Sequence, residues 1–234
     1  MAEFGEYIPI FGIDHLIYIL GLIAIALTLF MNKTHVRVHR RGITAAVILL
    51  IIGQQILMYS AYYFVLGDGF GFDASNALPL HISRINSILG LLFLLTKNDK
   101  IFRALAMFGL FAWLSFLYPS HVYGVTHPIG ISFFINHVVT LLLPFYGIIA
   151  YGQKIKTGDS LKVFPWFVLY VAAAYVANML TGGNYFYLRD KPVFEGMGDV
   201  FYIPLSLVFA LVLFKAGEWF YRKLGPGLRR GSHG

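Results

Sequence analysis

Long apolar segments separated by short polar loops constrain this chain more than any other feature of its sequence. Hydrophobic residues make up 58% of the 234 residues and charged residues only 12%, against about a quarter in an average soluble domain. A transmembrane helix needs about 20 mostly apolar residues. The sequence therefore predicts an all-α, polytopic membrane helix bundle, a single domain over residues 1–234, with seven transmembrane helices at about 13–31, 42–66, 78–96, 101–118, 132–151, 163–180 and 200–219.

The distribution of Lys and Arg predicts how this bundle is oriented. The loops after the first, third and fifth spans and the C-terminal tail hold all but three of the 18 basic residues, counting those at span edges. The three on the other side are Arg84, Arg189 and Lys191. Cytoplasmic loops carry an excess of Lys and Arg. We therefore expect a multi-pass protein of the cell membrane with its N-terminus outside and its C-terminus in the cytoplasm.

Charge and cysteine content exclude several functions. The formal net charge is +7, but the basic residues lie in short loops between apolar segments, where they set topology, so nucleic acid is not an expected partner. The chain has no cysteine, which rules out disulfides, thiolate metal ligands and a thiol nucleophile.

The segment Leu78-Pro-Leu-His-Ile-Ser-Arg-Ile-Asn-Ser87 carries an unusual set of polar side chains at the start of an apolar segment. It places His81, Ser83, Arg84 and Asn86 within two helical turns. Ionisable groups at membrane depth are costly and are usually functional. We therefore expect this segment to contribute to the functional site.

With the predicted orientation, the polar residues of the spans lie in the outer half of the membrane, whereas the cytoplasmic half is nearly all apolar. This pattern predicts one polar cavity that opens to the outside or to the outer leaflet. Its expected lining includes Asp14, His15, Gln55, Tyr59, His81, Arg84 and His137. An interfacial aromatic belt is the main alternative for the tyrosines, and hydrogen bonding between helices is the alternative for Ser87 and Thr140.

These groups suit acyl transfer or ester hydrolysis, with Ser83 as nucleophile, a histidine as general base, and Arg84 or Asn86 stabilising an oxyanion. On a regular helix Ser83 lies about 200° around from His81, which favours His137 as the base unless Pro79 loosens the first turn. A zinc site formed by His15, His81, His137 and Asp14 is an alternative, but the predicted spans contain no His-x-x-x-His pair. We expect no metal and no cofactor. A further alternative is binding or transport of a small molecule or lipid without catalysis.

Three features of the sequence resemble the YwaF family of bacterial integral membrane proteins. They are Leu-Pro-Leu-His-Ile-Ser (78–83), the histidine at 137, and Asn-Tyr-Phe-Tyr-Leu-Arg-Asp-Lys-Pro (184–192) before the last span. That family is similar to a eukaryotic transmembrane phospholipid acyltransferase, which implies lipid acyl chemistry at a nucleophile and histidine pair, with membrane lipids as partners. In the acyltransferase relatives a cysteine occupies the position of Ser83. Serine is a weaker nucleophile than cysteine at its ordinary pKa. A slow reaction or a hydrolytic reaction is therefore an alternative to acyl transfer.

The resemblance and the polar pattern together define the candidate residues. The catalytic candidates are Ser83, His81, His137, Arg84 and Asn86. The substrate-binding candidates are Gln55, Tyr59, Asp14, His15, Asn184, Arg189 and Lys191.

Overall fold

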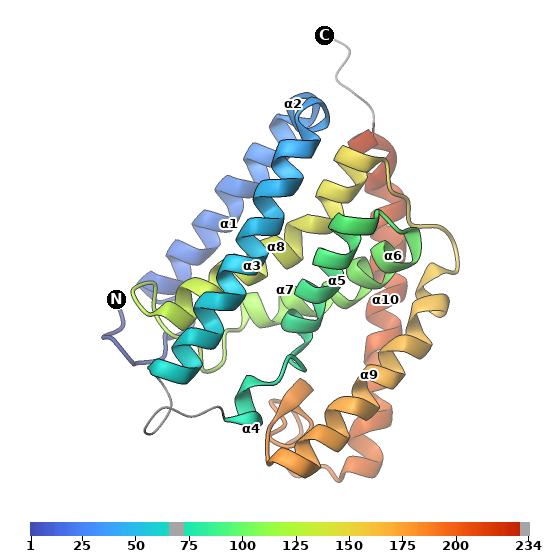
Figure 1. Cartoon of the computed structure of the whole chain (residues 1–234). Coiled ribbons are helices and arrows are strands. Elements are labelled where there is room, and N and C mark those ends of the chain that lie inside the picture. Colours follow the sequence, from blue (N-terminus) through green and yellow to red (C-terminus); the bar gives the residue numbers. More distant parts are fainter. Residues whose placement is uncertain (66–72, 230–234) are drawn as a thin grey trace.

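A computed structural model of the protein describes residues 1–65 and 73–229, and the chain is all-helical there (Figure 1). Within those residues no β-strand forms beyond an isolated bridge between Tyr7 and Tyr123. The elements in chain order are α1 (Ile13–Met31), α2 (Lys33–Val38), α3 (Arg40–Phe64), α4 (Ala74–Ala77), α5 (Ile82–Thr96), α6 (Asp99–Phe108), α7 (Leu110–Leu117), α8 (Pro128–Tyr151), α9 (Asp159–Thr181), the 3-10 helix η1 (Tyr185–Tyr187) and α10 (Asp199–Arg229).

Helix length and hydropathy support a multi-pass membrane protein. Six helical segments of the described chain are long and apolar enough to cross a membrane, counting α6 and α7 as one segment over Asp99–Leu117. Helix α5 is apolar but has only 15 residues, about 22 Å at 1.5 Å per residue. It corresponds to the third predicted span.

The start of α5 differs from the sequence prediction. The span was expected to begin at residue 78, with Pro79 in its first turn, but the helix begins at Ile82. Leu78 is extended, with φ −60° and ψ 148°, because a residue before proline is disfavoured in the helical region. His81 is also extended and is the N-cap residue. Leu66 and the loop at 67–72 lie outside the described residues.

Other boundaries also move. The predicted fourth span is divided at Gly109 into α6 and α7. Helix α8 begins at Pro128 instead of 132, because His127 caps it and proline is favoured in a first turn. Helix α10 continues to Arg229 instead of ending near 219, and the basic segment after α1 contains the short helix α2.

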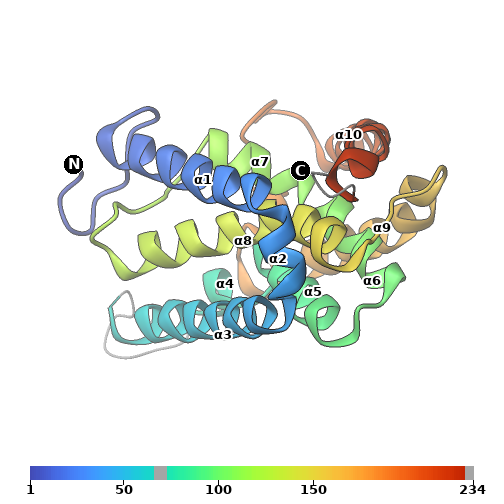
Figure 2. The same ribbon diagram turned by 90° about the horizontal axis from the view of Figure 1, so that it is seen from above.

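Helix α8 is the central element of the bundle. Figure 2 shows it between α1 and α3, and it also contacts α5, α6, α7 and α10. Most of its residues are buried, from Asn136 to Ala150 without interruption. On the other side of the molecule an aromatic cluster joins α6, α7, α9 and α10: the Phe167 ring centroid lies 5.2 Å from Phe108, 5.1 Å from Phe111 and 5.2 Å from Phe214.

The connecting segments gather at two opposite ends. At one end the Arg37 guanidinium donates to the carbonyls of Ile149 (3.2 Å) and Leu228 (2.6 Å), which joins α2 to the ends of α8 and α10. At the other end Asp14 accepts from the amide of Val125 at 3.0 Å. Figure 1 shows α2 and the end of α10 at the top and α4 at the bottom. The described basic loops therefore lie together at the end of the bundle that carries α2. Arg230 is outside the described residues.

Candidate functional site

A groove of about 440 Å³ lies between α3 and α5. Its volume is in the range of ligand sites, and its lining is mostly apolar. Two of the predicted substrate-binding residues, Gln55 and Tyr59, contribute to it. The lining residues are Ile51, Ile52, Gln55, Ile56, Tyr59, Ser60, Ser87, Ile88 and Leu91. Three of these, Ile52, Ile56 and Ile88, are exposed on the surface that faces lipid, so the groove opens sideways toward the membrane.

Ser83 lies in the first turn of α5 and is half-buried. Residues four apart share a helix face, so Ser83 is on the same side of α5 as the groove residues Ser87 and Leu91. It lies one turn closer to the end of the bundle that carries α4. Its hydroxyl makes no hydrogen bond to any residue of 1–65 or 73–229.

His81 precedes the helix, with φ −66° and ψ 138°. The angular separation of about 200° that a regular helix imposes between His81 and Ser83 therefore does not apply. Its ring packs edge-on against Tyr185, with 4.9 Å between ring centroids. Tyr185 in turn holds the segment before α5, since its hydroxyl donates to the Ala74 carbonyl (2.6 Å) and accepts from the Leu78 amide (3.0 Å).

His137 lies apart from this group. Its Nδ1 atom donates to the Phe133 carbonyl at 2.8 Å, and its ring lies against that of Phe133 in a tilted arrangement, with centroids 3.9 Å apart. The ring is also 6.1 Å from that of Phe116 on α7. The preceding residue, Asn136, contacts α5 through Ser87. The residues expected to border one cavity are therefore separated: Gln55 lines the groove, His81 packs on Tyr185, and His137 faces α7.

Arg84 is used for structure. Its buried guanidinium donates to the carbonyls of Asn76 (2.5 Å) and Leu78 (3.0 Å) and to the hydroxyl of Tyr62 (2.7 Å). These bonds engage both terminal nitrogens of the guanidinium in holding the segment before α5, which weighs against the expected oxyanion role. Asn86 points into the bundle, where it lies close to Gly109, and is likewise not directed at Ser83.

Asp14 and His15 hold the N-terminal segment instead of lining a cavity. Asp14 accepts from the amides of Ala2 (2.7 Å) and Val125 (3.0 Å). His15 accepts from the Phe11 amide at Nδ1 (3.0 Å) and donates from Nε2 to the Phe116 carbonyl (2.9 Å). Both ring nitrogens are thus engaged. Across the described parts of the chain, no cluster of three His, Cys, Asp or Glu residues could hold a metal ion.

The remaining predicted substrate-binding residues order the loop before α10. Asn184 accepts from the amides of Arg189 and Asp190, both at 3.0 Å. The Arg189 side chain donates to the Gly182 carbonyl at 2.5 Å. Lys191 is buried and forms an ion pair with Asp199 at 2.7 Å. The structure explains all three as loop-stabilising residues.

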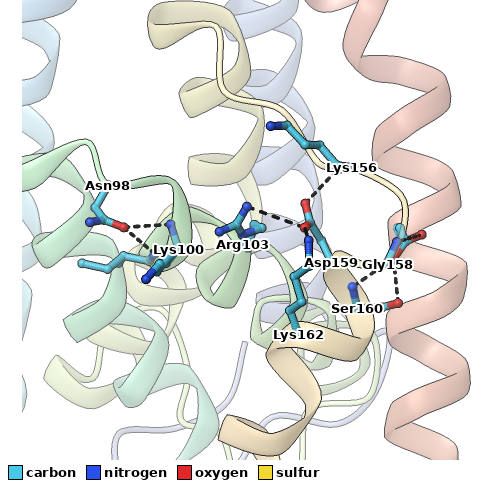
Figure 3. Close-up of polar contacts among 10 residues, drawn as sticks. Asn98, Lys100, Arg103, Lys156, Gly158, Asp159, Ser160 and Lys162 are labelled. Carbon is cyan, nitrogen blue, oxygen red and sulfur yellow. Dashed lines mark hydrogen bonds and ion pairs between the residues drawn. The ribbon is translucent and has the colours of Figure 1, made fainter.

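Sequence reasoning missed a buried charged cluster at the end of the bundle that carries the basic loops (Figure 3). Asp159 is fully buried, accepts from the Lys156 amide at 2.7 Å and pairs with Arg103 at 3.6 Å. Glu218 accepts from Gly158 and Ser160 at the start of α9. The signal was present, since Gly158-Asp159-Ser160 before an apolar segment is a helix-start pattern. Its carboxylates are fully engaged with the protein, so we assign it a structural role.

Comparisons with known proteins identify the family but no individual relative. No curated protein and no solved structure matches the chain. The family model of the TMEM164 family matches residues 10–216, which run from before α1 into the second half of α10. This match includes the groove, α5 and the loop before α10. The chain therefore belongs to the TMEM164 family, a family of transmembrane proteins.

Proposed function

We propose that this protein is a membrane-embedded lipid-active enzyme that carries out acyl transfer or acyl-ester hydrolysis at Ser83. One observation carries the proposal: Ser83 shares a face of α5 with Ser87 and Leu91, which line an apolar groove open to the membrane. An acyl chain lying in this groove would have its ester carbonyl at the Ser83 end. Apolar clefts with a few polar groups at one end are typical ligand sites.

The proposed chemistry uses groups around the start of α5. The Ser83 hydroxyl attacks the ester carbonyl carbon while His81 accepts its proton, and the same imidazole then protonates the departing alcohol. The unpaired N–H groups of the first turn stabilise the developing negative charge, because a helix N-terminus favours anions. A lipid hydroxyl or water then takes the acyl group from Ser83. His81 is preferred to His137 as the base because it immediately precedes the turn that carries Ser83.

The proposal also takes up the resemblance to the YwaF family and to a eukaryotic phospholipid acyltransferase. The residues that carry it, at 78–83 and 184–192, meet in the structure, since Tyr185 contacts both His81 and the segment before α5. The cysteine of the acyltransferase relatives corresponds to Ser83. A serine at this position favours hydrolysis or slow transfer, because a thiolate is the stronger nucleophile.

We further propose seven membrane spans, with α5 as the third, in the cell membrane. The short α5 is accommodated because the segment before it is covered by α4, α9 and η1. The excess of basic residues at the end with α2 supports a cytoplasmic location for that end. The N-terminus then lies outside, and Ser83 opens toward the outer leaflet.

The alternative is lipid binding in the groove without catalysis. It is favoured by the geometry of the histidines, because no imidazole in the described residues hydrogen-bonds to Ser83. Catalytic hydrogen bonds are often formed only with substrate bound, so we rank this alternative second. A zinc-dependent hydrolase ranks last, since both nitrogens of His15 are already engaged.

Lipid turnover by purified protein in mixed phospholipid vesicles tests the proposal. We expect Ser83→Ala to lose at least about 100-fold in turnover, whereas Ser115→Ala, the removal of a hydroxyl on α7, leaves turnover unchanged. We expect Leu91→Trp to block the groove, whereas Leu95→Trp, one turn further along α5 and exposed, has little effect. If wild type turns over none of the vesicle lipids but binds them in the groove, the alternative is correct.

A further inference from the structure

A buried band of uncharged polar side chains runs along α8 where it faces α3 and α5. On α8, Ser132, Asn136 and Thr140 are four residues apart and share one face. Their partners across the interface are Gln54, whose Oε1 accepts from Ser132 at 2.9 Å, and Ser87, whose hydroxyl donates to Asn136. We call the band the polar seam and define it by six buried residues, Gln54, Asn86, Ser87, Ser132, Asn136 and Thr140.

The seam contains every buried side-chain nitrogen or oxygen that lacks a hydrogen-bond partner within residues 1–65 and 73–229. These atoms are Gln54 Nε2, Asn86 Nδ2, Asn86 Oδ1 and Thr140 Oγ1. Buried polar groups are almost always hydrogen-bonded, because leaving one unpaired costs its full desolvation energy. Both polar side-chain atoms of Asn86 share this property, and the residues Asn86 and Thr140 are each 1% exposed.

Gly109 lies beside the Asn86 amide and the backbone of Thr140. A Cβ atom at this position would lie 3.0 Å from Asn86 Nδ2, 3.3 Å from the Thr140 carbonyl and 2.9 Å from the Leu105 carbonyl. The unpaired amide of α5, the backbone of α8 and the last turn of α6 therefore meet at the α6–α7 break. A helix break at membrane depth requires that neighbouring helices or ordered water satisfy the freed groups.

The unpaired atoms specify the chemistry of a ligand. Asn86 offers both an unpaired donor (Nδ2) and an unpaired acceptor (Oδ1). A cation would be bound only by the acceptors and repelled by the donor. An anion would be bound only by the donor and repelled by the acceptors. A neutral molecule that both donates and accepts serves both atoms and the Thr140 hydroxyl. Water is the smallest such molecule, and buried waters typically make two to four hydrogen bonds.

We infer that the polar seam binds ordered water between Asn86 and Thr140, at the α6–α7 break. The water would link α5 to α8 and complete the hydrogen bonding where the fourth span is interrupted. This site does not include Ser83. The water site can therefore be disproved without affecting the proposed enzyme activity, and the enzyme activity can be disproved without affecting the water site.

An experimental structure of the wild type at a resolution that shows ordered water is the direct test. We expect a density peak about 2.7–3.2 Å from both Asn86 Oδ1 and Thr140 Oγ1. A structure in which the Asn86 amide pairs with protein atoms, and no peak lies beside Thr140, would overturn the inference. Replacement of Na⁺ by K⁺ or choline should leave the melting temperature unchanged, and a Na⁺-specific increase would instead identify a cation site.

Substitutions provide a second test in detergent solution. We expect Asn86→Leu and Thr140→Val each to lower the melting temperature by several degrees, about 3–6 °C for a chain of this size. Because both side chains would contact the same water, the shift of the double variant should be smaller than the sum. Thr28→Val is the matched control, since Thr28 is exposed on α1 and its hydroxyl donates to the Ala24 carbonyl one turn earlier in the same helix. Additive shifts, or an Asn86→Leu variant more stable than wild type, would contradict the shared water.

Discussion

Glu218 on α10 accepts hydrogen bonds from both the backbone amide and the hydroxyl of Ser160, at 2.9 and 2.7 Å. It also accepts from the Gly158 amide at 3.0 Å. The carboxylate is buried and lies at the N-terminus of α9, where the helix dipole favours a negative charge. One side chain therefore joins the start of α9 to the middle of α10.

This arrangement predicts a large effect of Glu218 on stability. Glu218→Ala should lower the free energy of unfolding by about 2–4 kcal/mol, because it leaves buried donors unpaired. Glu218→Gln should cost less, because it keeps an acceptor. Unfolding curves in detergent measure both, with Glu195→Ala in an exposed loop as control. An alanine variant as stable as this control would show that the cluster contributes nothing.

His127 predicts a dependence of stability on pH. It is buried, its Nδ1 atom caps α8 by accepting from the Ile129 amide at 3.2 Å, and burial lowers the pKa of the imidazole. The unfolded chain, with a pKa of about 6.5, therefore binds protons first as the pH falls. Stability should decrease from about pH 6.5 downward, by at most about 1.4 kcal/mol per pH unit from this residue.

The comparison of wild type with His127→Asn isolates this effect. Asparagine is a good N-cap residue that does not titrate, and the other histidines are the same in both proteins. Melting temperatures between pH 7.5 and 5.5 should fall more steeply for wild type. Parallel curves would show that His127 is not the titrating group.

Arg84 should matter for folding more than for the reaction. Arg84→Lys loses the forked contacts to Asn76, Leu78 and Tyr62, and we expect a loss of about 1–3 kcal/mol in stability. Turnover per folded molecule should fall by less than about 10-fold. A drop of 100-fold or more in turnover with unchanged stability would instead assign Arg84 to the oxyanion.

Apolar segment length predicted most of the fold. Helix α1 has the predicted bounds, Ile13–Met31, because the apolar segment ends where polar residues begin. The break at Gly109 could not be predicted, since a glycine inside an apolar span is common in membrane helices. The residues that lie against it, Asn86 and the backbone of Thr140, meet Gly109 only in the folded bundle.

The candidate site was harder to predict than the fold. In the sequence, polar residues near one membrane surface that line a cavity cannot be distinguished from polar residues that hydrogen-bond to backbone groups of loops. Asp14 and Lys191 bind amides and carbonyls of neighbouring loops, and only the folded structure supplies those partners. Gln55 and Tyr59 line the groove between α3 and α5, which is mostly apolar and does not include His81, Arg84 or His137.

The proposed topology predicts which end of the protein is accessible in intact cells. Cysteines introduced singly at Glu3 and Lys223 replace exposed residues at the two ends, and the chain has no other cysteine. An impermeant maleimide should label Glu3→Cys and not Lys223→Cys, because positive loops stay in the cytoplasm. Labelling of Lys223→Cys in intact cells would reverse the orientation and place Ser83 toward the inner leaflet.

A covalent acyl group on Ser83 is the most direct test of the proposed function. Purified protein is quenched with acid during turnover of a phospholipid and analysed by intact mass and peptide mapping. The account predicts an acyl adduct on Ser83 in wild type and on the thiol in Ser83→Cys, and none in Ser83→Ala. An adduct on another residue, or lipid turnover by Ser83→Ala equal to that of wild type, would contradict it.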